Sequence, residues 1–306
     1  MILKQRSEPD ELKIMNLLEP RMIFTEKEKQ RHYSLRKGYK GEVQYDIWMK
    51  SLEIQNLTLN DLLLESSSTT FQIDSSVITQ NKLFLFEVKD YEGDYYYENE
   101  RLKLIHGEEI KDPLLQLKRS TSLFRQLLSS LGFHLEIESY VIFINPEFTL
   151  YQAAPKNAPI ILPSQLNRFM KKLNKRQSTL NNLHQKIADK LLVLHTVDNP
   201  YKRVPKYKYE QLKKGIVCGE CHSFVDRIVK REFVCSYCGT REKIETNVLR
   251  NIEEINLLFP DKKITTTLIY EWSNGTLSRK VIRHILTDNL KVIGTKRHQY
   301  FDYSNK

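Results

Sequence analysis

The sequence predicts a mixed α/β fold with a separate small module, and three observations support this prediction. The first half of the chain reads as a helix, several strands, a second helix and a last strand. At 306 residues the chain is long enough for two or three domains. All four cysteines lie between Cys218 and Cys238, which points to a metal-stabilised module and not to a disulfide framework.

Local signals place the elements of the first 150 residues. Helices are expected in "SEPDELKIMNLLEP", with Ser7 as N-cap, and in "KGYKGEVQYDIWMKSL". Strands are expected in "FQIDSSVI", "KLFLFEVK", "DYYYE" and "RLKLI". The helix "DPLLQLKRSTSLFRQLLSSLG" should begin with Asp112 as cap and Pro113 in its first turn, and it should end at Gly132. The apolar run "IESYVIFIN" suits a central buried strand.

Charged residues end one of these apolar strands. If "FQIDSSVI" and "KLFLFEVKD" form a hairpin with Ile78 opposite Leu83, then Asp74 lies opposite Glu87, and Lys89 shares their face. Two carboxylates so close repel each other unless one is protonated or a cation lies between them. The pattern therefore predicts Mg²⁺ or Mn²⁺ on the two acids, as in phosphodiester hydrolysis. The alternative is an exposed strand end with a cross-strand ion pair.

Four motifs in order carry a resemblance to a known family: "GYKGE", "IDSSVIT", "LFLFEVKDYEGDYYY" and "DPLLQLKRS". From about residue 37 to residue 145 the chain resembles the nuclease-related domain NERD, which is assigned to the PD-(D/E)XK, restriction-endonuclease-like superfamily. The resemblance implies an αβββαβ core. The catalytic residues that it implies are Glu42, Asp74, Glu87, Lys89 and Gln116, with Asp74 and Glu87 as the metal-binding acids.

Two of these positions have simpler explanations, and the motifs depart from the family pattern. Glu42 could be a first-turn acid that interacts with the helix dipole, and Gln116 could face solvent. Gln72 stands where relatives often carry an acid, and Ser75 with Ser76 replaces a continuation that more typically contains histidine. These departures concern the positioning of the substrate and not the metal site.

The cysteines form two C-x-x-C pairs separated by thirteen residues: Cys218, Cys221, Cys235 and Cys238. Four thiolates make the closed tetrahedral site of structural zinc, so this segment resembles a zinc ribbon. The alternatives are two redox pairs or an iron–sulfur site. A redox C-x-x-C should open a helix in a βαβ context, which "VCGECHSFV" lacks. We expect Zn²⁺ to stabilise the fold here without taking part in catalysis.

Positive charge is concentrated in one segment. From residue 165 to residue 214 there are thirteen Lys or Arg and three acids, a net charge of +10, which equals the excess of the whole chain. Such a block often binds a polyanion, although it can also be a solvated helix and linker. The candidate nucleic-acid contacts in this block are Lys171, Lys172, Lys175 and Arg176.

The C-terminal segment has a helical pattern of its own. "NVLRNIEEINLLFP" predicts an amphipathic helix, "ITTTLIYEWSNGTLSRKVIRHILTDNL" predicts two helices around "SNGT", and "KVIGTKRHQYFDY" predicts a β-hairpin. The order is similar to that of a winged helix-turn-helix, in which Arg279, Lys280 and Arg283 would contact DNA. A helical bundle without DNA binding is the alternative.

The sequence therefore predicts five segments: an N-terminal helical segment (1–36), a NERD-like nuclease domain (37–163), a basic helical connector (164–214), a zinc ribbon (215–242) and a helix-turn-helix-like module (243–306). The expected function is that of an Mg²⁺- or Mn²⁺-dependent nuclease or nucleic-acid-processing protein with DNA as its partner. The alternatives are a catalytically silent nucleic-acid-binding adaptor or regulator, and a redox or metal-handling protein. No apolar run is long enough to span a membrane and no secretory signal is visible, so a cytoplasmic location is expected.

Overall fold

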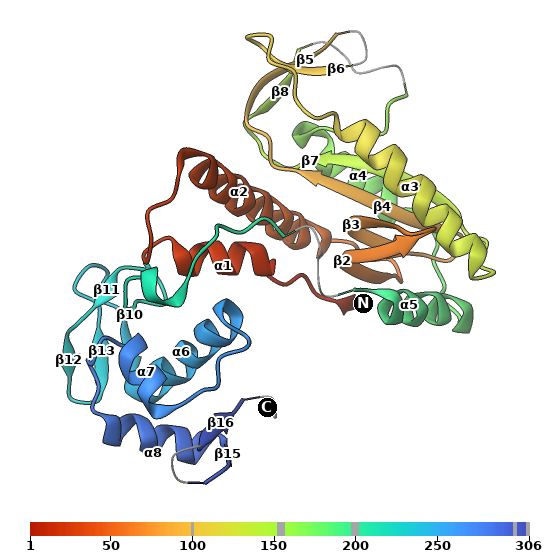
Figure 1. The fold of residues 1–306 in the computed structure, drawn as a ribbon. Coiled ribbons are helices and arrows are strands. Elements are labelled where there is room, and N and C mark those ends of the chain that lie inside the picture. The colour runs from red at the N-terminus through yellow and green to blue at the C-terminus, as the bar shows by residue number, and fades with distance from the viewer. Residues whose placement is uncertain (99–100, 152–156, 197–201, 296–298, 304–306) are drawn as a thin grey trace. The chain divides into compact units, whose positions relative to one another are not determined.

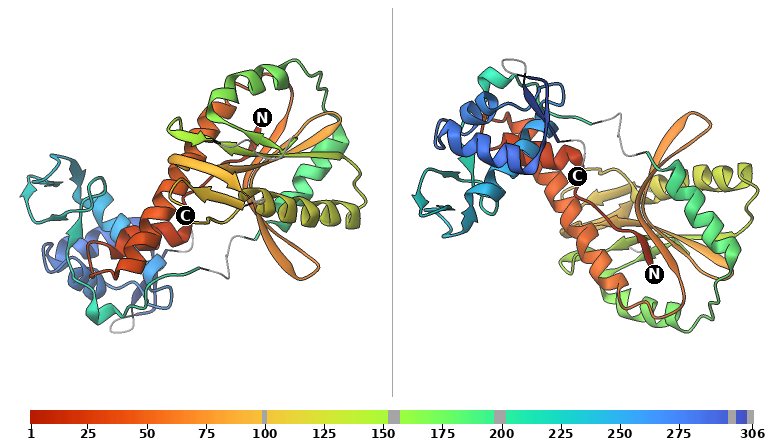
Figure 2. Two further views of the ribbon diagram at one scale, coloured as in Figure 1. Left: turned by 90° about the horizontal axis from the view of Figure 1, so that it is seen from above. Right: turned by 90° about the horizontal axis from the view of Figure 1, so that it is seen from below.

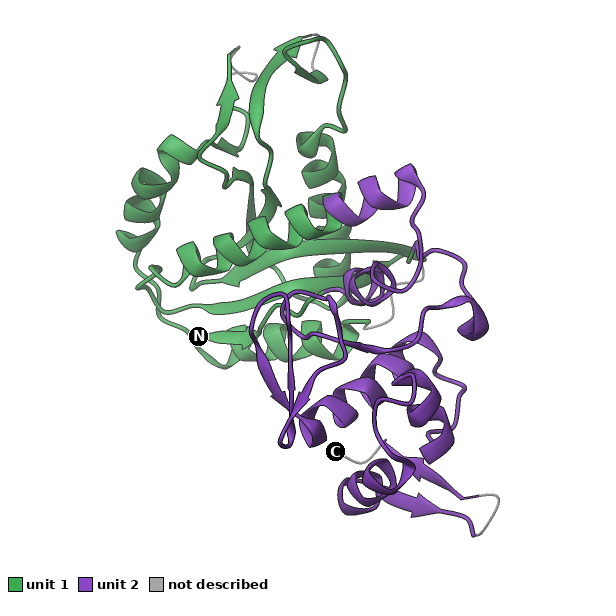
Figure 3. Cartoon of the chain, turned by 90° about the vertical axis from the view of Figure 1, so that its left-hand side faces the viewer, with its two compact units in different colours: residues 1–8, 34–202 green, residues 9–33, 203–306 purple. Residues whose placement is uncertain are grey.

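The computed structural model describes residues 1–98, 101–151, 157–196, 202–295 and 299–303. The chain divides into two compact units, which Figure 3 shows in green and purple. Unit 1 consists of residues 1–8 and 34–202, and unit 2 of residues 9–33 and 203–306. Within the described ranges, no helix has the length and apolar character needed to cross a membrane.

A six-stranded mixed sheet forms the centre of unit 1 (Figure 1). Strands β2, β3 and β4 are antiparallel neighbours, whereas β7 pairs in parallel with both β4 and β9, and β1 pairs in parallel with β2. In spatial order the strands are β1 (Ile2–Lys4), β2 (Leu57–Ser66), β3 (Thr69–Ile78), β4 (Lys82–Lys89), β7 (Glu136–Phe143) and β9 (Ile160–Ile161).

Helices cover both faces of this sheet, so that unit 1 has three layers (Figure 2). Apolar side chains of α2 (Glu26–Met49) and α4 (Leu166–Asn174) pack on one face, and those of α3 (Pro113–Ser130) and α5 (Asn182–Leu194) pack on the other. A short 3₁₀ turn (Pro163–Gln165) precedes α4. A smaller sheet of β6 (Arg101–Leu104), β5 (Gly93–Glu98) and β8 (Phe148–Leu150) adds its own apolar cluster.

The central elements confirm most of the expected local structure. The β3–β4 hairpin has the expected register, with Ile78 opposite Leu83, and β7 lies inside the sheet. The side chain of Asp112 accepts a hydrogen bond from the backbone N–H of Leu114 at 2.8 Å, and so caps α3. Gly132 follows that helix with a φ of +76°, a backbone conformation that glycine adopts without strain.

One expected cap is wrong, and four strands of unit 1 were not expected from the sequence. Helix α1 (Asp10–Leu18) begins directly after Pro9, and no side chain caps it. Ser7 is therefore not its N-cap: the residue before a proline is disfavoured in helical conformation, so the helix starts beyond Pro9. The strands of unit 1 without a prediction are β1, β2, β8 and β9.

The segment that the sequence analysis treats as a basic connector contributes helices to unit 1. Phe169, Met170 and Leu173 of α4 lie in the apolar cluster on the α2 side of the sheet. Ile187 and Leu191 of α5 lie in the cluster on the α3 side. Five of the thirteen basic residues of this segment therefore lie on helices whose apolar faces complete the three layers: Arg168, Lys171, Lys172, Lys186 and Lys190.

Unit 2 combines α1, the first part of α2, the cysteine segment and the C-terminal helices. Small antiparallel sheets hold the cysteine segment: β10 (Ile216–Val217) with β11 (Phe224–Val225), and β12 (Ile228–Val229) with β13 (Glu232–Val234) and β14 (Arg241–Lys243). A 3₁₀ turn (Tyr209–Gln211) precedes them. Helices α6 (Ile244–Leu258), α7 (Thr266–Trp272) and α8 (Arg279–Asn289) follow, and then the hairpin of β15 (Lys291–Ile293) and β16 (Tyr300–Asp302).

These C-terminal elements confirm the expected order of helix, two helices around a turn, and hairpin, although residues 296–298 of the hairpin lie outside the described residues.

A buried ion pair stabilises unit 2. The guanidinium of Arg21 from the α1 segment lies 2.9 Å from the carboxylate of Glu254 on α6, and both side chains are almost fully buried. Trp272 donates a hydrogen bond to the same carboxylate.

Gly41 explains how α2 approaches the end of β4. A Cβ atom at position 41 would lie 2.3 Å from the Cβ of Asp90, whereas a Cβ at Gly38, one turn earlier, would meet nothing within 4 Å. The Gly41→Ala substitution should therefore destabilise unit 1 by about 1–3 kcal/mol because the helix must move away from the strand. Gly38→Ala is the matched control, and it should instead stabilise by roughly 0.5–1 kcal/mol through helix propensity. Melting temperatures of the two variants test this contrast, and equal values would contradict it.

Candidate functional site

The candidate site lies where β3 and β4 diverge. Their ladder ends at the pair of Ser75 and Phe86, so the next positions along the two strands are Asp74 and Glu87. Beyond the ladder, Oδ2 of Asp74 accepts a hydrogen bond from the backbone N–H of Val88 at 2.8 Å. The carboxylate of Asp74 thus accepts the hydrogen bond that a backbone carbonyl would accept if the β3–β4 ladder continued. Both acids are buried, with 7% of Asp74 and 3% of Glu87 exposed.

A break in strand alternation accompanies this divergence. In the apolar cluster on the α3 side of the sheet, β2 contributes Leu59 and then Leu62, and β3 contributes Ile73 and Ile78. Odd and even positions of a regular strand face opposite sides, so each strand must be irregular between these residues. The register of the β2–β3 ladder would pair Asp61 with Asp74, but this one pair is missing from the ladder. Asp61 also has a φ of +55°. Such irregularities re-aim side chains, here at the candidate site.

Lys89 and Gln116 complete the α3 side of the site. The ammonium Nζ of Lys89 lies 2.6 Å from Oε1 of Glu87 and 3.4 Å from Oε1 of Gln116, in the first turn of α3. The neighbours of Glu87 along β4, Phe86 and Val88, are buried in the opposite apolar cluster. Alternation along β4 therefore directs Glu87 and Lys89 together toward α3, as the sequence predicted.

Glu42 reaches the site from α2, and a residue that the sequence analysis missed holds it there. Nη1 of Arg6 lies 2.7 Å from Oε2 of Glu42, and its Nε lies 3.0 Å from Oδ2 of Asp46. Nη2 of the same guanidinium donates to the backbone carbonyl of Asp74 at 2.8 Å. The Arg6 side chain is 2% exposed. No motif or periodicity marks this position; the one sequence signal is a charge two residues after the short strand β1.

Burial dominates the electrostatics of the three acids. Desolvation, with the nearby charge of Asp74, raises the pKa of Glu87 to about 7 and that of Glu42 to about 8. Desolvation also raises the pKa of Asp74, although Lys89, the Val88 N–H group and Arg6 oppose this. Burial lowers the pKa of Lys89, but the carboxylates of Glu87 and Asp74 outweigh it, so the net shift is upward. Ionisation of these acids therefore requires a higher pH than usual or additional positive charge.

The residues present fit a divalent cation. Carboxylate oxygens are the ligands that Mg²⁺ and Mn²⁺ prefer, and Mg²⁺ is commonly held by one or two carboxylates together with waters and substrate phosphates. Asp74 and Glu87 supply such a pair. Their pKa values are raised because negative charge is unfavourable at this buried position, and a bound cation would offset that charge. Glu42, in contrast, is held by the guanidinium of Arg6.

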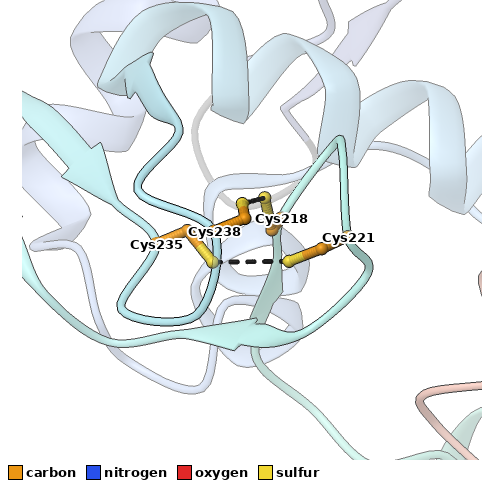
Figure 4. Close-up of side chains that lie close together, drawn as sticks. All are labelled: Cys218, Cys221, Cys235 and Cys238. Carbon is orange, nitrogen blue, oxygen red and sulfur yellow. Dashed lines mark hydrogen bonds between the residues drawn. The ribbon is translucent and has the colours of Figure 1, made fainter.

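The four cysteines form a second site, in unit 2. Sulfur atoms of Cys218, Cys221, Cys235 and Cys238 all lie within 4.8 Å of one another, and over the described ranges no other His, Cys, Asp or Glu residues converge in this way (Figure 4). The Sγ atoms of Cys221 and Cys235 are 3.5 Å apart, and those of Cys218 and Cys238 are 3.7 Å apart. This is the donor set of a closed tetrahedral metal site.

Arg250 of α6 joins this cysteine site to the helices of unit 2. Its guanidinium donates to the carbonyl of Val217 at 2.7 Å, directly before Cys218. It also contacts Glu242, which follows the second cysteine pair, at 2.7 Å. The cysteine segment is therefore fixed to α6 by charged hydrogen bonds from one side chain.

The candidate nucleic-acid-binding residues differ in whether their side chains already contact other residues of the protein. Lys171, Lys172 and Lys175 are exposed on and just after α4, and Lys280 and Arg283 are exposed on α8. Arg176 instead lies 3.1 Å from a carboxylate oxygen of Glu138 and over the ring of Phe84. Arg279 donates to Thr267 and lies over the ring of Tyr270. These two arginines make structural contacts within their own units.

A family comparison covers the first of the two sites. The family model of the nuclease-related domain, NERD, matches residues 37–144. Searches of curated proteins and of solved structures gave no match. The matched segment includes the acids, lysine and glutamine of the candidate site, and it ends before the four cysteines. Residues 37–144 of the chain are therefore a nuclease-related (NERD) domain, which suggests a nuclease-related function.

Proposed function

We propose that the protein is a nuclease that hydrolyses phosphodiester bonds of DNA with Mg²⁺ or Mn²⁺. The observation that supports this proposal is the joint burial of Asp74 and Glu87 beside Lys89 and Gln116 within the nuclease-related domain. Buried like charges destabilise a fold unless a ligand or a proton offsets them. A plain surface ion pair would not need two buried acids.

Each side chain of the site has a separate role in the proposed hydrolysis. A divalent ion on Asp74 and Glu87 would offset the charge of the phosphate and lower the pKa of the attacking water. Lys89 is held between Glu87 and Gln116, so its ammonium is fixed in place before substrate arrives. From there it can orient the water or stabilise charge that develops on the phosphate. Arg6 holds Glu42 and the Asp74 backbone, and so preserves the shape of the site.

A catalytically silent nucleic-acid-binding regulator is the second candidate. The observation behind this candidate is the 2.6 Å contact of Lys89 with Glu87, because an ion pair that only stabilises the fold has the same geometry. The exposed cations on α4 and α8 would then account for nucleic-acid binding without cleavage.

Cleavage assays on the full chain separate the two candidates. Labelled DNA and RNA, single- and double-stranded, are incubated with Mg²⁺, Mn²⁺ or EDTA. We expect metal-dependent cleavage of DNA that Asp74→Asn abolishes. We also expect Lys89→Met to lower the rate roughly 10²- to 10³-fold while leaving Mn²⁺ binding intact, since its role is in the transition state. Glu65→Gln, which removes an exposed acid of β2, is the control and should be fully active.

Metal-induced stabilisation tests the ion site without any activity. An asparagine at position 74 can still accept the hydrogen bond from Val88 N–H but removes the buried charge. Without metal, Asp74→Asn should thus melt at the same temperature as the wild type or higher. Wild type, Glu65→Gln and Lys89→Met should gain stability from Mn²⁺, whereas Asp74→Asn should not. Equal Mn²⁺-induced shifts in wild type and Asp74→Asn would show that the acids do not bind the ion.

The raised pKa values give the site a distinct pH dependence. The folded protein keeps protons on Glu87 up to about pH 7 and on Glu42 up to about pH 8, whereas the unfolded chain releases them near the usual 4.5. Stability falls with pH wherever the folded state binds more protons than the unfolded state. This contribution is therefore complete below about pH 4.5 and lost as the pH rises through about 7 to 8. Melting curves in EDTA should show a smaller decline for Glu87→Gln than for wild type over this range, and Mn²⁺ should reduce the wild-type decline.

We further propose that the four cysteines bind one zinc ion. Purified without chelator, the protein should contain one zinc per chain, and its native thiols should not react with a thiol reagent. Cys235→Ser should unfold the cysteine segment, because structural zinc contributes folding energy directly. Cys235→His is a variant that can still ligate zinc and should retain more of it. Protein that is purified without chelator and contains no zinc, or whose four native thiols react freely, would contradict the assignment.

A further inference from the structure

The outer face of α3 is cationic and contains no acid. Between Pro113 and Ser130 the helix carries Lys118, Arg119 and Arg125 and no Asp or Glu. All three side chains are exposed, and none forms a hydrogen bond or ion pair with another residue in the described part of the chain. Elsewhere in unit 1, cations such as Lys82 and Arg176 are paired with Glu138. The α3 face is therefore a surface whose charge is not balanced locally.

A hollow in this face brings two of the cations together with hydroxyl groups. It is a shallow depression, open to solvent, of about 450 Å³ between the end of the β2–β3 hairpin and the helix. Lys118 and Arg119 supply positive charge, and a leucine, Leu115, is 66% exposed at its wall. The residues that line the hollow are Thr69, Leu115, Lys118, Arg119, Ser122 and Leu123.

The chemistry of this lining suits one nucleotide of a strand. Arg and Lys bind phosphate oxygens, and serine and threonine hydroxyls are common further donors to phosphate and sugar. Leucine side chains offer apolar contact to a sugar or to a base edge. An acidic peptide or an anionic surface would use the two cations but would leave the leucines without a partner.

The hollow lies on the same helix as the candidate site. Gln116, whose Oε1 is 3.4 Å from Nζ of Lys89, precedes Arg119 by three residues. Residues at this spacing are neighbours on a helix surface, about one turn of 5.4 Å apart. Along a strand, successive phosphates rise by about 3.4 Å. A strand with its reacting phosphate at Lys89 would thus place a flanking nucleotide within reach of Arg119.

We propose that this hollow binds the sugar-phosphate backbone of the nucleic acid, one or two nucleotides from the bond that is cleaved. The placement beside the reacting phosphate rests on the proposed nuclease function, whereas the binding itself does not. Lys118, Arg119, Ser122 and Thr69 contact the phosphate and sugar, and Leu115 and Leu123 contact the apolar part of the nucleotide.

Binding measured without cleavage tests the surface. The full chain is titrated in EDTA against fluorescein-labelled single- and double-stranded DNA over a series of NaCl concentrations. For Lys118→Ala/Arg119→Ala we expect the slope of log affinity against log salt to fall by roughly two, about one for each phosphate that no longer meets a cation. The matched control is Lys186→Ala/Lys190→Ala, which removes two exposed cations from α5 in the same unit and should keep the wild-type slope. Arg119→Lys should retain most of the binding.

Further readouts separate this proposal from the nuclease proposal. With Mg²⁺ or Mn²⁺, the double α3 variant should raise KM and leave kcat nearly unchanged, since the hollow does not touch the reacting atoms. A chain that never cleaves DNA but shows the expected change in slope would support the surface and contradict the nuclease. Wild-type slopes in the α3 variant, or an equal loss in the α5 control, would overturn the surface proposal even if the protein cleaves DNA.

Discussion

The charge of the buried acids is the constraint on which the arrangement of unit 1 depends. Asp74 and Glu87 are buried at the end of the β3–β4 ladder, and Glu42 faces them from α2. Arg6 approaches from one side and Lys89 from the other. Removing one partner of a buried ion pair destabilises a protein by about 3–5 kcal/mol, because the remaining charge is left without compensation. The positions of β1, α2 and α3 relative to the sheet are therefore coupled to this cluster.

Backbone geometry and charge act together at the site. The irregularity at Asp61 and the end of the β3–β4 ladder leave the side chain of Asp74 to bond the edge of β4. The absence of a side chain at Gly41 lets α2 come close enough to Asp90 for Glu42 to reach the same place. The first two features depart from regular structure, whereas Gly41 lies in a regular helix, and each of the three brings a carboxyl group toward the others. Local departures of this kind are common next to functional sites.

The sequence predicted the parts of the fold that depend on local signals. The hairpin register followed from a short turn and two apolar runs, and the start of α3 followed from Asp112 and Pro113. Asp74, Glu87 and Lys89 could be placed because strand alternation and a family resemblance both pointed to them, whereas Glu42 and Gln116 followed from the resemblance alone. The Cys218 to Cys238 spacing likewise indicated a shared metal site.

The features that the sequence did not predict depend on contacts between distant residues or on local backbone conformation. Arg6 lies 36 residues from Glu42 and 68 from Asp74, so no local pattern connects them. The alternation in β2 is broken at Asp61, which hides the apolar period of that strand. The Ser7 cap was wrong because Pro9 delays the start of α1. A tertiary contact decided the first of these cases, and local backbone conformation decided the other two.

The division of the chain into units has a consequence for fragments of this protein. The segment that matches the nuclease-related family, 37–144, omits β1 with Arg6, and it omits α4 and α5. A fragment cut at the family boundaries would keep Glu42 and Asp74 without the guanidinium beside them, and it would expose apolar surface on both faces of the sheet. Residues 203–306 alone would leave Glu254 buried without Arg21. The evolutionary domain and the physical folding unit thus have different boundaries, and it is the full chain that contains both units intact.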